Sequence, residues 1–185
     1  MVARLLLLWG LVAPAAALEL GDLAVAYRDG RLSVDLTAVL DAPPQAVWRV
    51  AGDYDRLHVL IPAVATSRRL PSDDPSRVRV EARLQGCVWV FCTELDHVMA
   101  ISEPARLHRS GRTLPALSEF RGGRAQWSVA PASDGTRLAM DLWLEPDIWI
   151  PPLIGPYLIE RRVRRELQEA LRALEAAAAG GGGDD

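Results

Sequence analysis

The side chains most suited to acid–base or metal chemistry are three histidines, His58, His97 and His108. They lie in separate parts of the chain, and no motif of a metalloprotease, redox dithiol, serine hydrolase or phosphate-binding loop accompanies them. Asp96 precedes His97, but neighbouring residues of a regular strand point to opposite faces of a sheet, so they would not share a site. We therefore predict no metal, no cofactor and no catalytic group, which indicates a binding protein rather than an enzyme.

His97 nevertheless falls in the apolar phase of a predicted strand. A histidine in that position is either a core residue with a hydrogen-bonded ring or a polar anchor for a bound molecule. The sequence leaves both interpretations open.

The chain has two cysteines, Cys87 and Cys92. Five residues of straight strand span about 17 Å, far beyond the reach of a disulfide. If the chain turns between the cysteines, opposed residues of an antiparallel pair lie about 4.5 Å apart at Cα, which suits the bond. We predict a disulfide that closes a hairpin; the alternative is two free cysteines packed as small apolar side chains.

The tip of this hairpin would consist of four apolar residues, Val88, Trp89, Val90 and Phe91. Burying each large side chain contributes roughly 1.5–3 kcal/mol, so leaving all four in water is costly. We expect the tip to gate a cavity or to contact a membrane surface. The alternative is an ordinary buried strand.

The N-terminal residues are typical of a secretory signal peptide. Arg4 precedes an apolar stretch over 5–12 that is too short to span a bilayer, and small residues follow up to Ala17. We predict cleavage near Ala17 and a periplasmic or secreted protein; a retained membrane anchor is the alternative. The chain then divides into a signal peptide over 1–17, one domain over 18–178 and a disordered tail over 179–185.

Composition is consistent with a single globular domain. The chain has 185 residues, of which 50% are hydrophobic and 24% charged, so a substantial core can form. A net charge of −3 gives no sign of nucleic-acid binding, and we expect a monomer.

Hydrophobic periodicity predicts the elements that must position these residues. Apolar and polar residues alternate most clearly over 31–40, 77–84, 93–102 and 136–145, and the whole pattern indicates an antiparallel sheet of about seven strands. Two short helices are expected over 45–51 and 53–60. A long helix over 155–178 has an apolar stripe at helical spacing.

Two segments carry a family resemblance: DAPPQAVWRVAGDYDRLHVLIPAV over 41–64 and GGRAQWSVAPASDGTRLAMDLWLEPDIWIP over 122–151. They resemble the START-like (SRPBCC) superfamily, and most closely its coenzyme-Q-binding and polyketide cyclase/dehydrase group. The resemblance covers about 32–177. It implies an α+β helix-grip fold whose sheet wraps around the C-terminal helix. It also implies a cavity for apolar cargo such as a lipid, a polyprenyl quinone or a polyketide.

Strand and helix phase then predict which residues line the cavity. The expected lining comprises Tyr54, Leu57, Ile61, Val80, Leu95, His97, Met99, Phe120, Trp127, Met140, Leu142, Leu144, Ile154, Tyr157, Leu158 and Val163.

Three functions remain open at this point. The first is a non-enzymatic carrier of a hydrophobic small molecule, with peripheral membrane contact. The second is a cyclase or aromatase that uses the same cavity, and the third is a protein-interaction module with a filled cavity. Four arginines over 161–165 could contact lipid headgroups, but nearby glutamates favour a solvated helix face with ion pairs.

Overall fold

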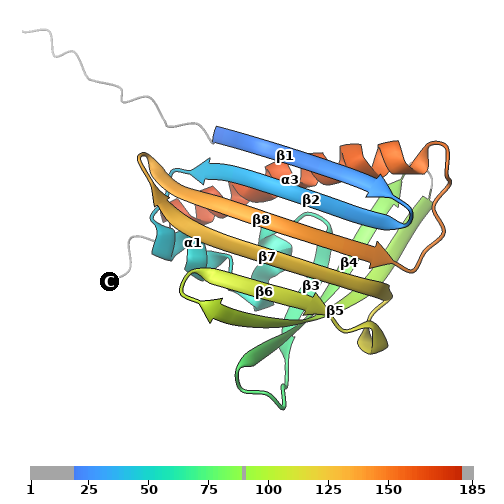
Figure 1. Cartoon of the computed structure of the whole chain (residues 1–185), viewed down its shortest axis with the longest axis horizontal. Helices are drawn as coiled ribbons and strands as arrows, with labels where there is room; N and C mark the ends of the chain where they lie inside the picture. The colour runs from blue at the N-terminus through green and yellow to red at the C-terminus, as the bar shows by residue number, and fades with distance from the viewer. Residues whose placement is uncertain (1–18, 89–90, 181–185) are drawn as a thin grey trace, which may run out of the picture.

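The computed structural model describes residues 19–88 and 91–180, which form an α+β fold (Figure 1). Eight antiparallel strands make one sheet in the order β1-β2-β8-β7-β6-β5-β4-β3, one strand more than expected. A long C-terminal helix lies along the concave side, which is the predicted helix-grip arrangement. The strands are β1 (Glu19–Arg28), β2 (Arg31–Leu40), β3 (Val64–Leu70), β4 (Arg77–Val88), β5 (Phe91–Ala105), β6 (His108–Thr113), β7 (Phe120–Ala132) and β8 (Gly135–Pro146).

The turn between β1 and β2 shows how local sequence sets the sheet. Asp29 and Gly30 form the two-residue loop, and both have positive φ, at 51° and 80°. A loop with this backbone matches the right-handed twist of the strands that it joins. The turn aligns β1 against β2, and inward-facing residues such as Val34 and Leu36 are then almost fully buried.

Short helices follow β2, as predicted. They are α1 (Pro44–Val50), the 3-10 helix η1 (Tyr54–Arg56) and α2 (Leu57–Leu60). Proline suits the first turn of α1 because the N–H that it lacks would have no partner there. Val47 is fully buried, and both α1 and α2 contact the C-terminal helix.

The C-terminal helix, α3, spans Gly155–Gly180 and is 26 residues long. It extends two residues past the predicted end at 178, so residues 179 and 180 are helical rather than part of a tail. Leu171, Leu174 and Ala178 are buried in the main hydrophobic core together with residues of β2 and β8. Among the described residues, no helix combines the length and apolar character needed to cross a bilayer.

Hydrogen bonds hold α3 to both sides of the curved sheet. Glu160 accepts a hydrogen bond from the Tyr27 N–H at 2.9 Å, and Arg164 donates one to the Leu23 carbonyl at 2.7 Å, both on β1. On the other side, Arg162 donates to the Cys87 carbonyl of β4. The sheet therefore curls far enough for one helix to contact its first strand and a strand near its opposite edge.

The predicted disulfide is confirmed. Cys87 and Cys92 are directly opposed in the β4–β5 pair, and their Cα atoms lie 3.9 Å apart. Trp89 and Val90 lie outside the described residues, and the side chains of Val88 and Phe91 are not described either. The proposed gating or membrane role of this tip therefore stays a prediction.

We expect loss of the disulfide to lower the free energy of unfolding by about 2 kcal/mol, because the bond restricts the unfolded chain. Urea unfolding with and without dithiothreitol measures this. A Cys87→Ser/Cys92→Ser variant should match the reduced wild type and not respond to the reductant. Equal unfolding midpoints for oxidised and reduced wild type would contradict the expectation.

Candidate functional site

Burial changes along the concave face of the sheet. Leu40 and Leu138 are 0% and 6% exposed, at the end of the sheet where the C-terminal half of α3 packs. Farther along β8, the inward-facing Met140, Leu142 and Leu144 are only half-buried. The interior is thus densely packed under one half of α3 and looser under the half where α3 begins.

Two adjoining clefts open at this looser end, with volumes of about 370 Å³ and about 400 Å³. They share Pro62, Cys87 and Arg162, so they lie between the turn after α2, the disulfide hairpin and α3. The first is also lined by Gln85, Gly86, Cys92, Thr93 and Glu94, and the second by Leu158, Arg161, Arg165, Glu166 and Glu169. The clefts therefore lie on the surface between the helix and the hairpin.

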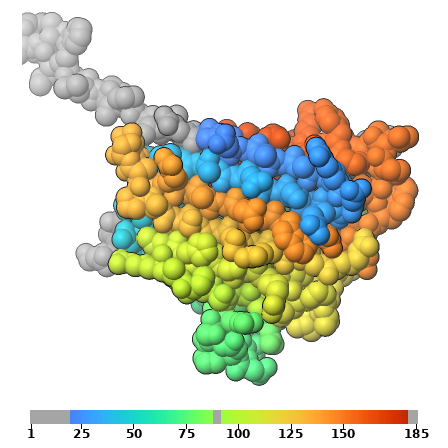
Figure 2. Space-filling view, in the orientation of Figure 1, coloured from blue at the N-terminus to red at the C-terminus, as the bar shows by residue number. Residues whose placement is uncertain are grey.

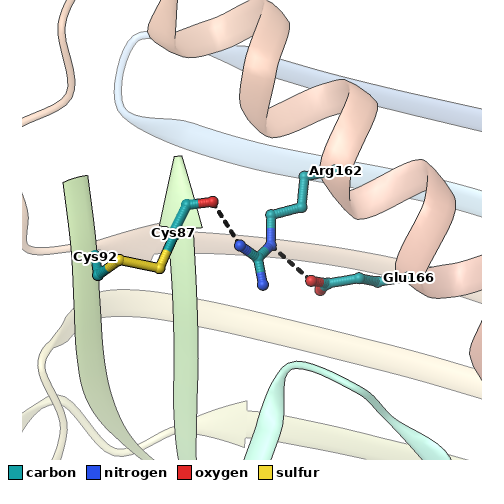
Figure 3. Close-up of a disulfide and its surroundings, with 4 residues drawn as sticks. All are labelled: Cys87, Cys92, Arg162 and Glu166. Carbon is teal, nitrogen blue, oxygen red and sulfur yellow. Dashed lines mark hydrogen bonds and ion pairs between the residues drawn. A yellow bond between two sulfur atoms is a disulfide. The ribbon is translucent and has the colours of Figure 1, made fainter. Parts of the chain in front are cut away.

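Arg162 lines both clefts. Figure 3 shows its side chain reaching from α3 toward Cys87 and Glu166. Its Nε donates to Glu166 at 2.6 Å, and Nη1 donates to the Cys87 carbonyl. The guanidinium packs over Gly86, where an added Cβ would lie 3.3 Å from the Arg162 Cζ atom. Arg162 thus joins α3 to the hairpin. The Arg162–Glu166 pair confirms the expected i,i+4 ion pair on this helix.

His97 lies deep in the concave face. It is 7% exposed, its Nε2 lies 2.9 Å from the Thr113 hydroxyl oxygen, and its ring centroid is 4.4 Å from that of Phe120. Burial disfavours the imidazolium and lowers the pKa of His97 to about 4. The ring is therefore neutral at physiological pH, and the contacts favour the hydrogen-bonded core histidine. Sequence reasoning missed Thr113, because nothing local marks a partner sixteen residues away.

Asp96 lies on the other face of the sheet from His97, as predicted. Its carboxylate accepts a hydrogen bond from Arg83 at 2.9 Å, and 42% of its side chain is exposed. Asp96 and His97 therefore do not form an acid–base pair.

Tyr54 forms a second buried group of apolar residues with Val80 and Ile101. Its hydroxyl is buried and has no hydrogen-bond partner among the described residues. Burial raises the pKa of Tyr54, and the nearby Arg109 cation opposes that rise. Arg109 lies 3.7 Å from the Trp48 ring centroid and donates to the Trp48 carbonyl at 3.1 Å. Sequence reasoning also missed Arg109. Its inward position could have been predicted from β6, because Arg109 alternates in phase with Gly111 and Thr113.

The predicted lining residues fall into three groups by exposure. Tyr54, Val80, Leu95, His97 and Phe120 are buried. The half-buried group comprises Leu57, Ile61, Met99, Trp127, Met140, Leu142, Leu144, Leu158 and Val163. Of all these residues, Leu158 alone lines a cleft described above, and it lines only the second.

Ile154 and Tyr157 form the third group and correct the prediction. They are 49% and 63% exposed. Tyr157 is two residues from both Gly155 and Ile159 on the inward stripe, and two residues turn a helix by roughly 200°. Its side chain therefore points away from the sheet. Ile154 precedes the first turn of α3 and also points outward.

The described residues contain no group of three or more His, Cys, Asp or Glu side chains placed to hold a metal ion. The concave face offers an apolar surface with a few buried polar groups, among them His97 and Thr113, and the clefts beside it are lined largely by polar residues. Such surfaces bind apolar ligands and use isolated polar groups to orient them.

Comparison with known proteins fits this geometry. The model of the family described as polyketide cyclase / dehydrase and lipid transport matches residues 31–179. The chain belongs to this family. Among curated protein sequences, none matches the chain.

Solved structures share the fold at low sequence identity. The Zhui aromatase/cyclase from a Streptomyces species is 18% identical, with a TM-score of 0.62 over 82% of this chain and 99% of that one. A START superfamily protein from Mycobacterium smegmatis is 16% identical, with a TM-score of 0.60 over 79% and 96%. A STAR-related lipid transfer protein from Xanthomonas axonopodis is 14% identical, with a TM-score of 0.57 over 82% and 98%. At these identities the likeness establishes the fold.

The low pKa of His97 predicts a pH dependence of stability. Between pH 6.5 and about 4 the unfolded chain takes up a proton at His97 that the folded chain excludes, so the free energy of unfolding falls as the pH falls. Between pH 7.5 and pH 4.5 the loss should be about 2–3 kcal/mol. Urea unfolding of wild type and His97→Gln at both pH values measures it, because glutamine cannot titrate. The same pH dependence in both proteins would contradict the prediction.

Proposed function

We propose that this protein is an exported carrier that binds a hydrophobic small molecule between the concave sheet and the N-terminal half of α3. The observation that carries the proposal is the burial gradient along β8, from the buried Leu138 to the half-buried Leu142 and Leu144. In a fully packed interior, leucines that face inward are almost inaccessible to solvent. A hydrophobic ligand in this position would cover the apolar surface that α3 leaves accessible.

The family supports this class of ligand, because its description includes lipid transport alongside polyketide cyclisation. Cargo would enter through the clefts beside Arg162. A lipid, a polyprenyl quinone and a polyketide are all compatible with an apolar surface of this kind. We favour binding without catalysis, because His97 is paired with a hydroxyl and Asp96 faces the other side of the sheet.

A cyclase or aromatase is the second candidate, and one observation favours it. The Tyr54 hydroxyl is buried and has no partner among the described residues, so it is available to a polar group of a bound substrate. Its raised pKa keeps it protonated, as a hydrogen-bond donor must be. Conversion of a linear poly-β-ketone mimic, lost in Tyr54→Phe, would favour this function over the carrier.

We expect Leu142→Trp to weaken binding of the apolar fluorophore N-phenyl-1-naphthylamine by about tenfold, because the larger side chain occupies the space left for ligand. Fluorescence titration measures the affinity. Leu117→Trp is the matched control, since Leu117 is 52% exposed outside the concave face. Unchanged affinity in a folded Leu142→Trp protein would contradict the proposed binding site.

Native mass spectrometry of protein purified from its own cells, followed by solvent extraction, tests the nature of the cargo. A co-purifying lipid or quinone would support the carrier. An empty protein that also fails to bind the fluorophore would favour the third candidate, an interaction module with a filled interior.

Export is supported by the disulfide, because such bonds persist in oxidising compartments. The signal segment itself, 1–17, lies outside the described residues. We expect intact-protein mass spectrometry of the periplasmic or secreted fraction to find a chain that begins at Leu18 with both cysteines oxidised. A full-length, membrane-bound chain would instead indicate a retained anchor.

A further inference from the structure

Apolar side chains are exposed together where β8 connects to α3. Trp149, Leu153, Ile154 and Tyr157 are 76%, 94%, 49% and 63% exposed. They make up four of the seven large apolar side chains that are exposed among the described residues. This segment lies at one end of the molecule and projects there in the space-filling view (Figure 2). A concentration of this kind on a folded protein marks an interaction surface.

The backbone holds these side chains outward in an ordered way. Proline at 146, 151, 152 and 156 prevents the segment from continuing β8 as a strand. The Gly155 N–H donates to the Pro151 carbonyl at 2.9 Å, and Ile150 packs so closely on Gly155 that no side chain would fit there. Ile150 is thus drawn inward while its neighbours Trp149 and Leu153 face solvent.

Basic side chains continue the same surface along α3. Tyr157, Arg161 and Arg165 follow one another at four-residue spacing, so they lie on one face of the helix within about 12 Å. Arg161 and Arg165 are exposed and form no ion pair with a described residue. Of the neighbouring carboxylates, Glu160 is engaged with the β1 backbone and Glu166 with Arg162, while the exposed Glu169 lines the second cleft beside the two arginines.

We propose that this surface, made of Trp149, Leu153, Ile154, Tyr157, Arg161 and Arg165, docks the protein on an anionic lipid bilayer. Exposed aromatic and aliphatic side chains insert at the level of the headgroups, and arginines directly behind them reach the phosphates. This arrangement favours a membrane over a protein partner. Arg161 and Arg165 lie behind the exposed apolar residues, where they would meet the headgroups once those residues have inserted.

The docking surface adjoins the entrance to the proposed binding site. Arg161 and Arg165 line the second cleft together with Leu158, which is the residue after Tyr157. A protein docked by this surface therefore presents that cleft to the membrane. The inference concerns a partner and does not require the proposed carrier function.

Sedimentation with vesicles tests the docking surface. We expect the protein to bind vesicles of equal parts phosphatidylglycerol and phosphatidylcholine, and to bind pure phosphatidylcholine at least tenfold more weakly. Trp149→Ser/Leu153→Ser should lose at least tenfold in affinity for the anionic vesicles. Leu117→Ser makes the same kind of change at an exposed leucine elsewhere and should bind as wild type does. Circular dichroism and thermal unfolding establish that each variant is folded.

A second pair of variants tests the arginines. Arg161→Gln/Arg165→Gln should weaken binding to anionic vesicles by about tenfold or more and reduce its dependence on salt. Arg124→Gln/Arg137→Gln removes the same charge from exposed sites on β7 and β8 and should have little effect. Equal losses in the two pairs, or wild-type binding by Trp149→Ser/Leu153→Ser, would overturn the proposal.

Two further outcomes separate this inference from the carrier function. Leu142→Trp should bind vesicles normally while losing the fluorophore, and Trp149→Ser/Leu153→Ser should bind the fluorophore normally while losing vesicles. A wild-type protein that ignores vesicles but self-associates through Trp149 and Leu153 would replace the membrane with a protein partner and overturn the proposal.

Discussion

The attachment of α3 to both sides of the sheet is the constraint on which the remaining structure depends. A sheet with one apolar face has to bury that face, and here a single helix is available to cover it. Hydrogen bonds from α3 reach the backbone of β1 on one side and of β4 on the other, so the strands between them must curve around the helix. That curvature gives the molecule its concave surface.

The same constraint explains why the interior is uneven. Where Leu171, Leu174 and Ala178 meet the sheet, side chains fill the space between the layers. Nearer the start of α3, the helix does not fully cover the inward-facing Leu142 and Leu144 of β8. Arg162 reaches the hairpin with a long polar side chain, so helix and hairpin are joined at this end by hydrogen bonds rather than by apolar packing.

Sequence patterns predicted what depends on local periodicity. The strand phases, the positions of the short helices and the disulfide all follow from alternation, proline placement and the spacing of Cys87 and Cys92. Pairings between distant residues could not be predicted in this way, since nothing local joins His97 to Thr113 or Arg109 to Trp48. Tyr157 was predicted to line the cavity, although its position is about half a turn from the inward stripe of α3.

Contacts between α3 and β1 also have a consequence for how the chain acquires its structure. The hydrogen-bonded residues of these two elements are 133 and 141 positions apart in the chain. The first and last described elements therefore contact each other only when both are present. During synthesis the concave face stays uncovered until the final residues of α3 have emerged, and such distant contacts form slowly. Truncation of α3 would therefore leave the apolar concave face exposed and prone to aggregation.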